Sequence, residues 1–303
     1  CGRNTLHANH LHPADDFMGT HGDASKSYFG APIFTGWPTW HSETHQQVYY
    51  RWLERAWKGG MRLMVMLAVT NEFACSASKR LRGTDCRNSM AAIDKQLDAA
   101  LAFEQWHKTQ AGGGWFRIVR TPDEAEQTIR DGKLAVVLGM EPDMLFGCKK
   151  KSTCTPAFVK DQIDKYFDQK SVRYIYPVHD FDNQFGGTAM FIDDLETANK
   201  AINGSGDVVQ DARNNITNVA TGKGTLTGEG FATAPCPNSD TRGCNTRGLT
   251  ADGNALIQAL MAKGVLIDID HMSAKTIDDT LAIAEPRGYP LFVGHGLFGE
   301  VHA

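Results

Sequence analysis

Short apolar runs alternate with helix-like stretches along most of the chain, and this alternation constrains the fold more than any other feature. The apolar runs, such as 63–69 and 172–178, end near residues 10, 69, 140, 178, 270 and 295, and helix-like stretches such as 46–58, 88–108, 157–170 and 250–263 lie between them. Such alternation predicts an α/β fold with a parallel sheet and crossover helices. An open doubly wound sheet and a closed (β/α)8 barrel both fit. The P-loop pattern is absent, which weakens a nucleotide-binding open sheet.

Five of the six apolar runs, all but 63–69, deliver a histidine or a glutamate at their ends. These residues are His10 and His12, Glu141, His179, His271 and His295. The carboxyl ends of parallel barrel strands form one rim, where active sites are built. One histidine at a strand end is more often a core residue, and one buried glutamate forms a salt bridge to Arg or Lys in about half of such cases. The repetition favours a single polar cluster at the rim.

The residue types in this cluster are those of a metal centre. His10 and His12 lie two apart on an extended chain, so their side chains point to the same side. Two metals fit the ligand count, with Glu141 bridging, His10 and His12 on one metal, and His271 and His295 on the other. Imidazole and carboxylate favour zinc, with manganese, cobalt, iron or nickel as alternatives. A bridged pair supplies hydroxide near neutral pH, which predicts amide or ester hydrolysis.

The chain resembles the membrane (renal-type) dipeptidases, peptidase family M19 of the amidohydrolase superfamily, and is most similar to a divergent bacterial branch. The motifs span nearly the whole chain. They are His10-Leu-His12-Pro, Lys133-Leu-Ala-Val-Val-Leu-Gly-Met-Glu141, Val172-Arg-Tyr-Ile-Tyr-Pro-Val-His179, Gly264-Val-Leu-Ile-Asp-Ile-Asp-His271-Met-Ser and Pro290-Leu-Phe-Val-Gly-His295. The segments Gly36–Trp40 and Asp182–Thr188 also look like that branch.

The resemblance implies a (β/α)8 TIM-type barrel and the two-zinc ligand set given above. It also implies catalytic roles for Glu141 and for His179, which would contact the substrate and stabilise the tetrahedral intermediate. Typical members carry His-x-Asp where this chain has His10-Leu-His12. The family's last strand carries an aspartate, and none can be assigned here.

The domain prediction follows from the count of strand runs. We expect residues 1–303 to form one hydrolase barrel domain that lacks its last two strands, with an irregular insertion at about 180–246. A C-terminal remainder of the same protein, or a second chain, would then complete the barrel. Assembly of the protein into a homo-oligomer stays an open alternative.

Six of the seven cysteines fall into close pairs, Cys75/Cys86, Cys148/Cys154 and Cys236/Cys244, each bracketing a polar stretch. Such pairs predict short disulfide-closed loops and an oxidising compartment, so we expect a secreted, periplasmic or cell-surface protein. A zinc knuckle is the rival interpretation, but no Cys-x-x-Cys occurs, and free thiols are the third. Cys1 belongs to none of these pairs. Three interpretations stay open for it: a lipidated N-terminus, a disulfide to a cysteine elsewhere, or a free thiol.

Charge and hydropathy exclude several other classes. The net charge of −4 implies no broad basic face for nucleic acid, and the apolar runs are too short to cross a bilayer, which takes ~20 residues. Together with the metal-ligand pattern, the resemblance implies a zinc-dependent, dipeptidase-like enzyme that cleaves a small peptide or amide. The alternatives are a lactonase or deacylase on the same scaffold, and a non-catalytic binding or structural protein.

Overall fold

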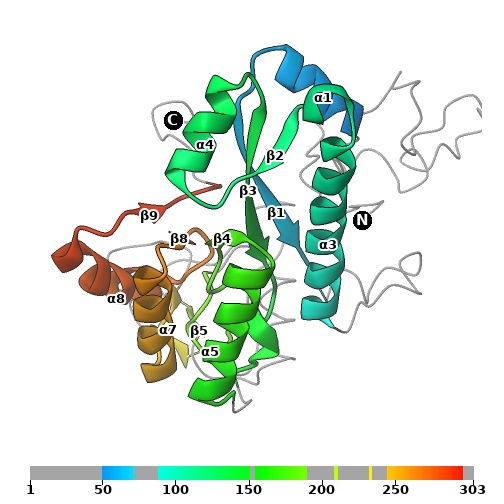
Figure 1. Ribbon diagram of the computed structural model, residues 1–303. Coiled ribbons are helices and arrows are strands. Elements are labelled where there is room, and N and C mark those ends of the chain that lie inside the picture. Colours follow the sequence, from blue (N-terminus) through cyan, green and yellow to red (C-terminus); the bar gives the residue numbers. More distant parts are fainter. Residues whose placement is uncertain are drawn as a thin grey trace, which may run out of the picture.

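The computed structural model describes residues 50–70, 72, 88–150, 154–189, 208–210, 232–233 and 244–295. Within these residues strands and helices alternate as predicted (Figure 1). The helices are α1 (Tyr50–Lys58), α3 (Ser89–Lys108), α4 (Pro122–Arg130), α5 (Pro156–Asp164), α7 (Ala251–Ala262) and α8 (Ala274–Ala284). The strands of the main sheet are β1 (Leu63–Val69), β2 (Phe116–Ile118), β3 (Leu134–Glu141), β4 (Val172–Ile175), β8 (Leu266–Asp268) and β9 (Leu291–Phe292).

All pairings in this six-stranded sheet are parallel, which confirms the predicted sheet type. The strand order is β1-β3-β4-β8-β9, and β2 lies beside β3. β1 pairs with β3 along its whole length, from Leu63 opposite Ala135 to Val69 opposite Glu141. β2 and β4 share the other edge of β3, at its beginning and its end respectively. The carboxyl ends of β1, β3, β4, β8 and β9 therefore lie at one edge of the sheet.

The order of the strands distinguishes the two topologies that the sequence left open. Along this path each strand lies beside the one before it, with no reversal of direction through the sheet. Doubly wound sheets reverse their order at a switch point, whereas barrels keep chain order. The arrangement therefore favours the barrel type. The described strands form no closed ring, so the eight-stranded barrel itself stays a prediction.

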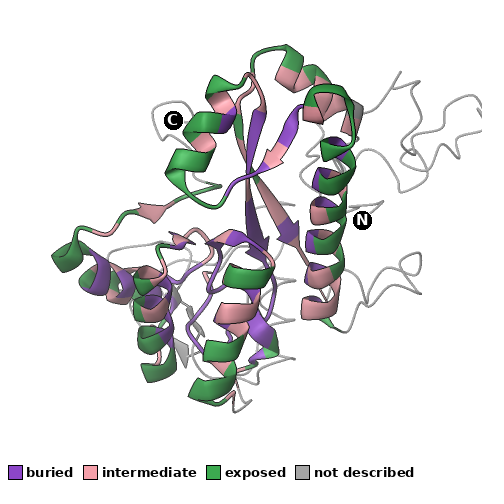
Figure 2. Cartoon of the chain, viewed as in Figure 1, coloured by how far each residue is buried: buried purple, intermediate pink, exposed green. Residues whose placement is uncertain are grey.

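The core lies between the sheet and the helices. β3 reads Leu-Ala-Val-Val-Leu-Gly-Met-Glu, and all but one of its residues are buried. A near-continuous apolar strand of this kind is typical of a parallel sheet that is covered on both faces. α3 and α7 contribute buried residues on their inner sides, and their outer sides are exposed (Figure 2).

Side-chain caps fix where the helices begin. The Thr121 hydroxyl accepts a hydrogen bond from Glu124 N at 3.2 Å, and Pro122 occupies the first helical turn of α4. Thr250 caps α7 and Ser273 caps α8 in the same manner. The first N–H groups of a helix have no backbone acceptor within the helix. The cap side chain accepts a hydrogen bond from one of them and so fixes the residue at which the helix begins. The crossover helices therefore start at defined distances after the strands.

Two boundaries differ from the sequence prediction. The run 172–178 was expected to be one strand, but β4 ends at Ile175. Pro177 has no N–H to donate to a neighbouring strand, which limits the extension of the ladder. The helix expected over 157–170 divides into α5 and a π-helical turn, Lys165–Gln169.

The predicted insertion at 180–246 is described only in part. A small sheet comprises β5 (Val208–Gln210), β6 (Ala232–Thr233) and β7 (Cys244–Asn245), with β5 in the middle. The disulfide Cys148–Cys154 is present, as predicted. Cys75, Cys86, Cys236 and the side chain of Cys244 lie outside the described residues. No described helix has both the length and the apolar character needed to cross a membrane.

Candidate metal centre

Four side chains from separate strand ends meet at the carboxyl edge of the sheet. Glu141 is the last residue of β3, and the three histidines follow β4, β8 and β9. We call Glu141, His179, His271 and His295 the rim cluster. Glu141 Oε1 lies 3.1 Å from the Nε2 atom of each histidine. Residues that are up to 154 positions apart in the sequence thus converge on one oxygen atom.

The rings of the rim cluster also contact one another. His179 and His271 meet edge to face, with ring centroids 4.5 Å apart, and His271 meets His295 in the same way at 5.3 Å. The Tyr176 ring stacks on His295 at 5.5 Å, and its hydroxyl lies 3.5 Å from His295 Nε2. The cluster is therefore packed from several sides. His179 is buried, whereas 45% of the His295 side chain is exposed, so solvent reaches the cluster from the β9 side.

The charge of Glu141 follows from these contacts. Burial alone would raise the pKa of this carboxyl group. The interactions with His179, His271 and His295 outweigh burial and hold the pKa of Glu141 well below its usual range. The carboxylate is therefore ionised at neutral pH, which is the state that binds a metal cation.

His179 contacts a second carboxylate through its other nitrogen. His179 Nδ1 lies 3.0 Å from Asp143 Oδ1, and neither side chain is appreciably exposed. Burial lowers the pKa of His179, but Asp180, Glu141 and Asp143 together raise it well above its ordinary value. Complete burial raises the pKa of Asp143.

Asp180 lies against two histidines of the rim cluster. Its Oδ1 atom is 3.7 Å from His179 Nε2 and 3.6 Å from His271 Nδ1. Two sets of potential ligand atoms therefore overlap at His271. One set is Glu141, His271 and His295, and the other is His179, Asp180 and His271.

The donor atoms suit a divalent transition metal. Within each set the potential ligand atoms all lie within 4.8 Å of one another. Ligands ~2.0 Å from a tetrahedral zinc ion lie ~3.3 Å apart, so small side-chain adjustments bring either set to binding distance. Imidazole nitrogen with carboxylate oxygen is the mixture that zinc and its neighbours prefer. The residues present therefore fit the metal that the sequence predicts.

A second group of polar residues fixes the backbone position of His295. Asp268 ends β8, is fully buried, and accepts hydrogen bonds from the Tyr174 hydroxyl and from Gly294 N at 2.9 Å. The His295 backbone N–H donates to Asp270. Burial raises the pKa of Asp268. These contacts fix the end of β9, and with it the position of His295.

The segment 179–189 is locked to the strand end that carries His271. Thr188 Oγ1 donates to the carbonyl oxygens of His179 and His271, the latter at 3.1 Å. Ala189 N donates to the same His271 oxygen at 2.8 Å. One hydroxyl therefore ties together the backbones of two histidines of the rim cluster.

Asp182 and Asn183 give this segment its shape. Asp182 Oδ1 accepts from Thr188 N at 3.0 Å and from Asn245 Nδ2 at 2.7 Å. Asn183 Oδ1 accepts from Phe185 N at 2.8 Å, an Asx turn of the kind that short polar side chains favour. The stretch Asp182–Thr188, which the sequence analysis singled out, thus positions Thr188.

The structure brings together four of the six predicted site residues. His10 and His12 lie outside the described residues. Sequence reasoning missed Asp143, Asp180 and Asp268 as neighbours of the site. A signal existed for two of them, because Asp143 comes two positions after Glu141 and Asp180 directly follows His179.

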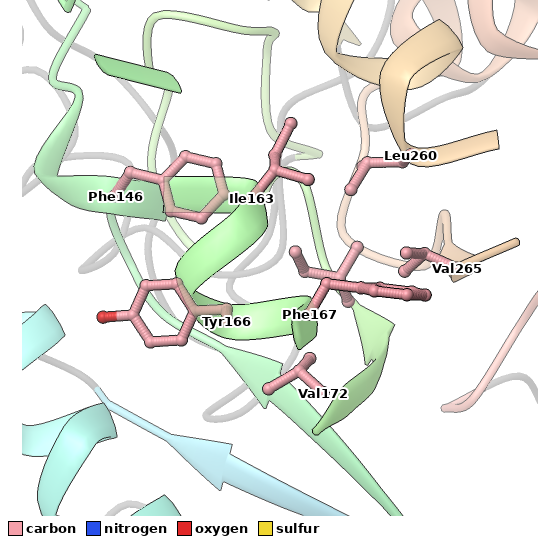
Figure 3. A pocket seen from close by; sticks show the side chains of 8 residues that line it. Phe146, Ile163, Tyr166, Phe167, Val172, Leu260 and Val265 are labelled. Carbon is pink, nitrogen blue, oxygen red and sulfur yellow. The ribbon is translucent and has the colours of Figure 1, made fainter. Parts of the chain in front are cut away.

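An apolar pocket lies elsewhere in the fold, between the π-helical turn, β4 and α7 (Figure 3). Its lining includes Phe146, Tyr166, Phe167, Val172 and Leu260. These side chains offer almost no partner for a polar substrate, in contrast to the rim cluster. The pocket therefore suits apolar groups, whereas the titratable side chains converge at the rim.

Comparison with known proteins gives structural neighbours only. No protein-family profile and no curated protein matches the chain. Among solved structures it is similar to an amidohydrolase from Pseudomonas aeruginosa, at 11% identity and a TM-score of 0.43, over 78% of this chain and 47% of that one. A metallopeptidase from Rhodobacter sphaeroides, liganded with a phosphinate mimic of the dipeptide L-Ala-D-Ala, matches at 16% identity and a TM-score of 0.43, over 76% and 52%.

A dipeptidase of metallopeptidase family M19 matches at 16% identity and a TM-score of 0.42, over 76% of this chain and 50% of that one. The family that the sequence motifs resemble is thus among these neighbours. The chain spans about half the length of these three solved structures.

Proposed function

We propose that this chain is a metal-dependent hydrolase that cleaves a small peptide or amide, with dipeptide-like substrates as the first choice. One observation carries the proposal: three imidazole nitrogens surround one oxygen of an ionised, buried carboxylate at the carboxyl edge of a parallel sheet. Active sites of barrel enzymes lie at that edge. A purely structural role would not require three histidines to face one carboxylate oxygen.

We propose zinc as the metal and two ions as the full complement. Glu141, His271 and His295 would hold one ion, and His10 and His12 would hold the second, with Glu141 shared. Divalent ions in such a centre supply Lewis acidity and activate water near neutral pH. His179 has a different role in this proposal, because its Nε2 atom lies beside the carboxylate and can donate to the carbonyl oxygen of a substrate. The disulfide Cys148–Cys154 supports an oxidising compartment, such as the periplasm or the exterior of the cell.

The test is hydrolysis by the zinc-loaded chain, before and after chelation. The substrates would be a panel of L-X-L-X and L-X-D-X dipeptides, N-acyl amino acids and lactones. We expect dipeptide cleavage that chelation abolishes and added zinc restores. Cleavage confined to N-acyl amino acids or lactones would replace the dipeptidase assignment with a deacylase or lactonase. Cleavage that chelation leaves intact, or no cleavage by zinc-loaded protein, would contradict a metal-dependent hydrolase.

A further inference from the structure

Asp143 is a fully buried residue whose carboxylate has no assigned role in the proposed reaction. Its relative exposure is 0%. One of its oxygens lies 3.0 Å from His179 Nδ1, and the other accepts a hydrogen bond from the backbone N–H of Glu72. Burying a carboxylate costs several kcal/mol unless charged or polar partners compensate. The placement of Asp143 therefore depends mainly on His179.

Of the three carboxylates that face His179, Asp180 lies 3.7 Å from Nε2, and the two nearest ones contact opposite nitrogens of the ring. Glu141 Oε1 lies 3.1 Å from Nε2, and Asp143 Oδ1 lies 3.0 Å from Nδ1. Both carboxylates come from one short segment, Glu141-Pro142-Asp143, that directly ends β3. Pro142 fixes its own φ angle and so restricts how the two flanking side chains can move relative to each other. The two carboxylates of this segment therefore contact the imidazole ring of His179 from opposite sides.

The consequence concerns where the ring carries its proton. Asp143 Oδ2 accepts from the backbone N–H of Glu72 and Oδ1 faces His179 Nδ1 at 3.0 Å, so the carboxylate offers Nδ1 an acceptor and keeps a proton there. The backbone near His179 adds a second constraint, because Thr188 Oγ1 donates to the His179 carbonyl oxygen. The ring therefore has a fixed orientation, with Nε2 directed at the rim cluster. Carboxylates that hold the outer nitrogen of a functional histidine are a general device in metal and hydrolytic sites.

We propose that Asp143 is a positioning residue, which holds the proton of His179 on Nδ1 and so directs Nε2 at Glu141 and at the substrate bound there. The part that concerns substrate rests on the proposed function. The part that concerns the ring does not, because it follows from contacts within the chain. The variant Asp143→Asn keeps the size of the side chain but removes its charge. The variant Asp143→Leu removes the acceptor altogether.

The experiment is NMR of the full chain labelled with 15N-histidine, with His179→Gln used to assign the His179 signals. In the wild type we expect a slowly exchanging, downfield Nδ1–H proton from His179. In Asp143→Leu this signal should be lost, and in Asp143→Asn it should move upfield. The control Asp161→Asn, an exposed site on α5, should leave it unchanged. A wild type without the signal, or a folded Asp143 variant that keeps it unchanged, would overturn the proposal. If Asp143→Leu does not fold, the Asp143→Asn spectrum decides.

A kinetic readout separates the positioning role from the proposed function. For whichever substrate the zinc-loaded chain cleaves, Asp143→Asn should lower kcat at least about tenfold and leave KM nearly unchanged, because it disturbs a group that acts on the reacting atoms. An unchanged kcat would overturn the proposal. If the wild type cleaves no substrate but its Nδ1–H signal depends on Asp143, then the proposed function fails while the positioning of His179 stands.

Discussion

Gly294 donates its backbone N–H to Asp268 Oδ2 at 2.9 Å, one residue before His295. A side chain at this position has no room, because a Cβ would lie 2.6 Å from Tyr176 Oη, 2.7 Å from Asp268 Oδ2 and 2.9 Å from Tyr174 Oη. The glycine thus lets β9 approach a buried group of three oxygen atoms. That close approach places His295 beside Glu141.

Gly294→Ala should therefore push β9 away and weaken metal binding. Forcing a methyl group into a filled site costs about 1–3 kcal/mol, and we expect a lower free energy of unfolding together with lower zinc affinity. Urea unfolding and calorimetric zinc titration measure the two effects. Gly288→Ala is the matched control, since its left-handed φ of 57° brings strain while no atom lies within 4 Å of the added Cβ. Equal losses of zinc affinity in both variants would contradict the special role of Gly294.

The disulfide Cys148–Cys154 supports the site segment through Gln184. The Gln184 side chain accepts from Cys154 N at 2.9 Å and donates to Cys154 O at 2.8 Å. Replacing both cysteines by serine should lower the free energy of unfolding by about 2 kcal/mol, the loop-closure value for so short a loop. Hydrogen exchange should also become faster in residues 179–189. Unchanged exchange there would mean that the disulfide and the site segment are independent.

His107 should make the stability depend on pH away from the site. It is 2% exposed, lies among Phe103, Trp106 and Trp115, and neither ring nitrogen has a hydrogen-bond partner among the described residues. Burial lowers the pKa of His107 from its ordinary 6.5, and Arg117 lowers it further while Glu54 opposes. The unfolded chain therefore takes up this proton first as the pH falls. The stabilisation is complete above pH ~6.5 and is lost progressively below it.

The variant His107→Leu removes this contribution. Between pH ~6.5 and ~5, its free energy of unfolding should fall less steeply than that of the wild type, by at most ~1.4 kcal/mol per pH unit. Urea unfolding at several pH values measures both slopes. Subtracting one slope from the other removes the contribution of the other titrating groups, which both proteins share. Parallel slopes would show that His107 has the same pKa in the folded and unfolded chains.

Much of the sheet could be predicted because local patterns determine it. The apolar run 63–69 has the same bounds as β1. The cap residue Thr121, followed by Pro122, marks the start of α4. Periodicity and capping act within a few residues, so a single sequence reports them. Pro177 was a signal in the sequence for the early end of β4, whereas the π-helical turn depends on packing around Tyr166 and Phe167, which no local pattern reports.

The rim cluster was visible in the sequence for a different reason. Parallel strands share one carboxyl edge, so a polar residue at each strand end implies a common location. The residues that hold the cluster carry no such mark. Asp268 is an ordinary strand residue by position, and Thr188 lies seven positions beyond Phe181 in an irregular segment. Their roles come from contacts with residues far along the chain, which no local pattern encodes.

The most direct test of the account is zinc binding by the wild type and by Glu141→Gln, measured by metal analysis and calorimetric titration. We expect about two zinc ions per wild-type chain, and a loss of affinity in Glu141→Gln that exceeds the ~10–100-fold cost of losing an outer-shell partner. Glu126→Gln, at a 64% exposed position on α4, should bind zinc as the wild type does. A folded wild-type chain that binds no zinc, or a Glu141→Gln variant that binds it as tightly as the wild type, would contradict the metal centre.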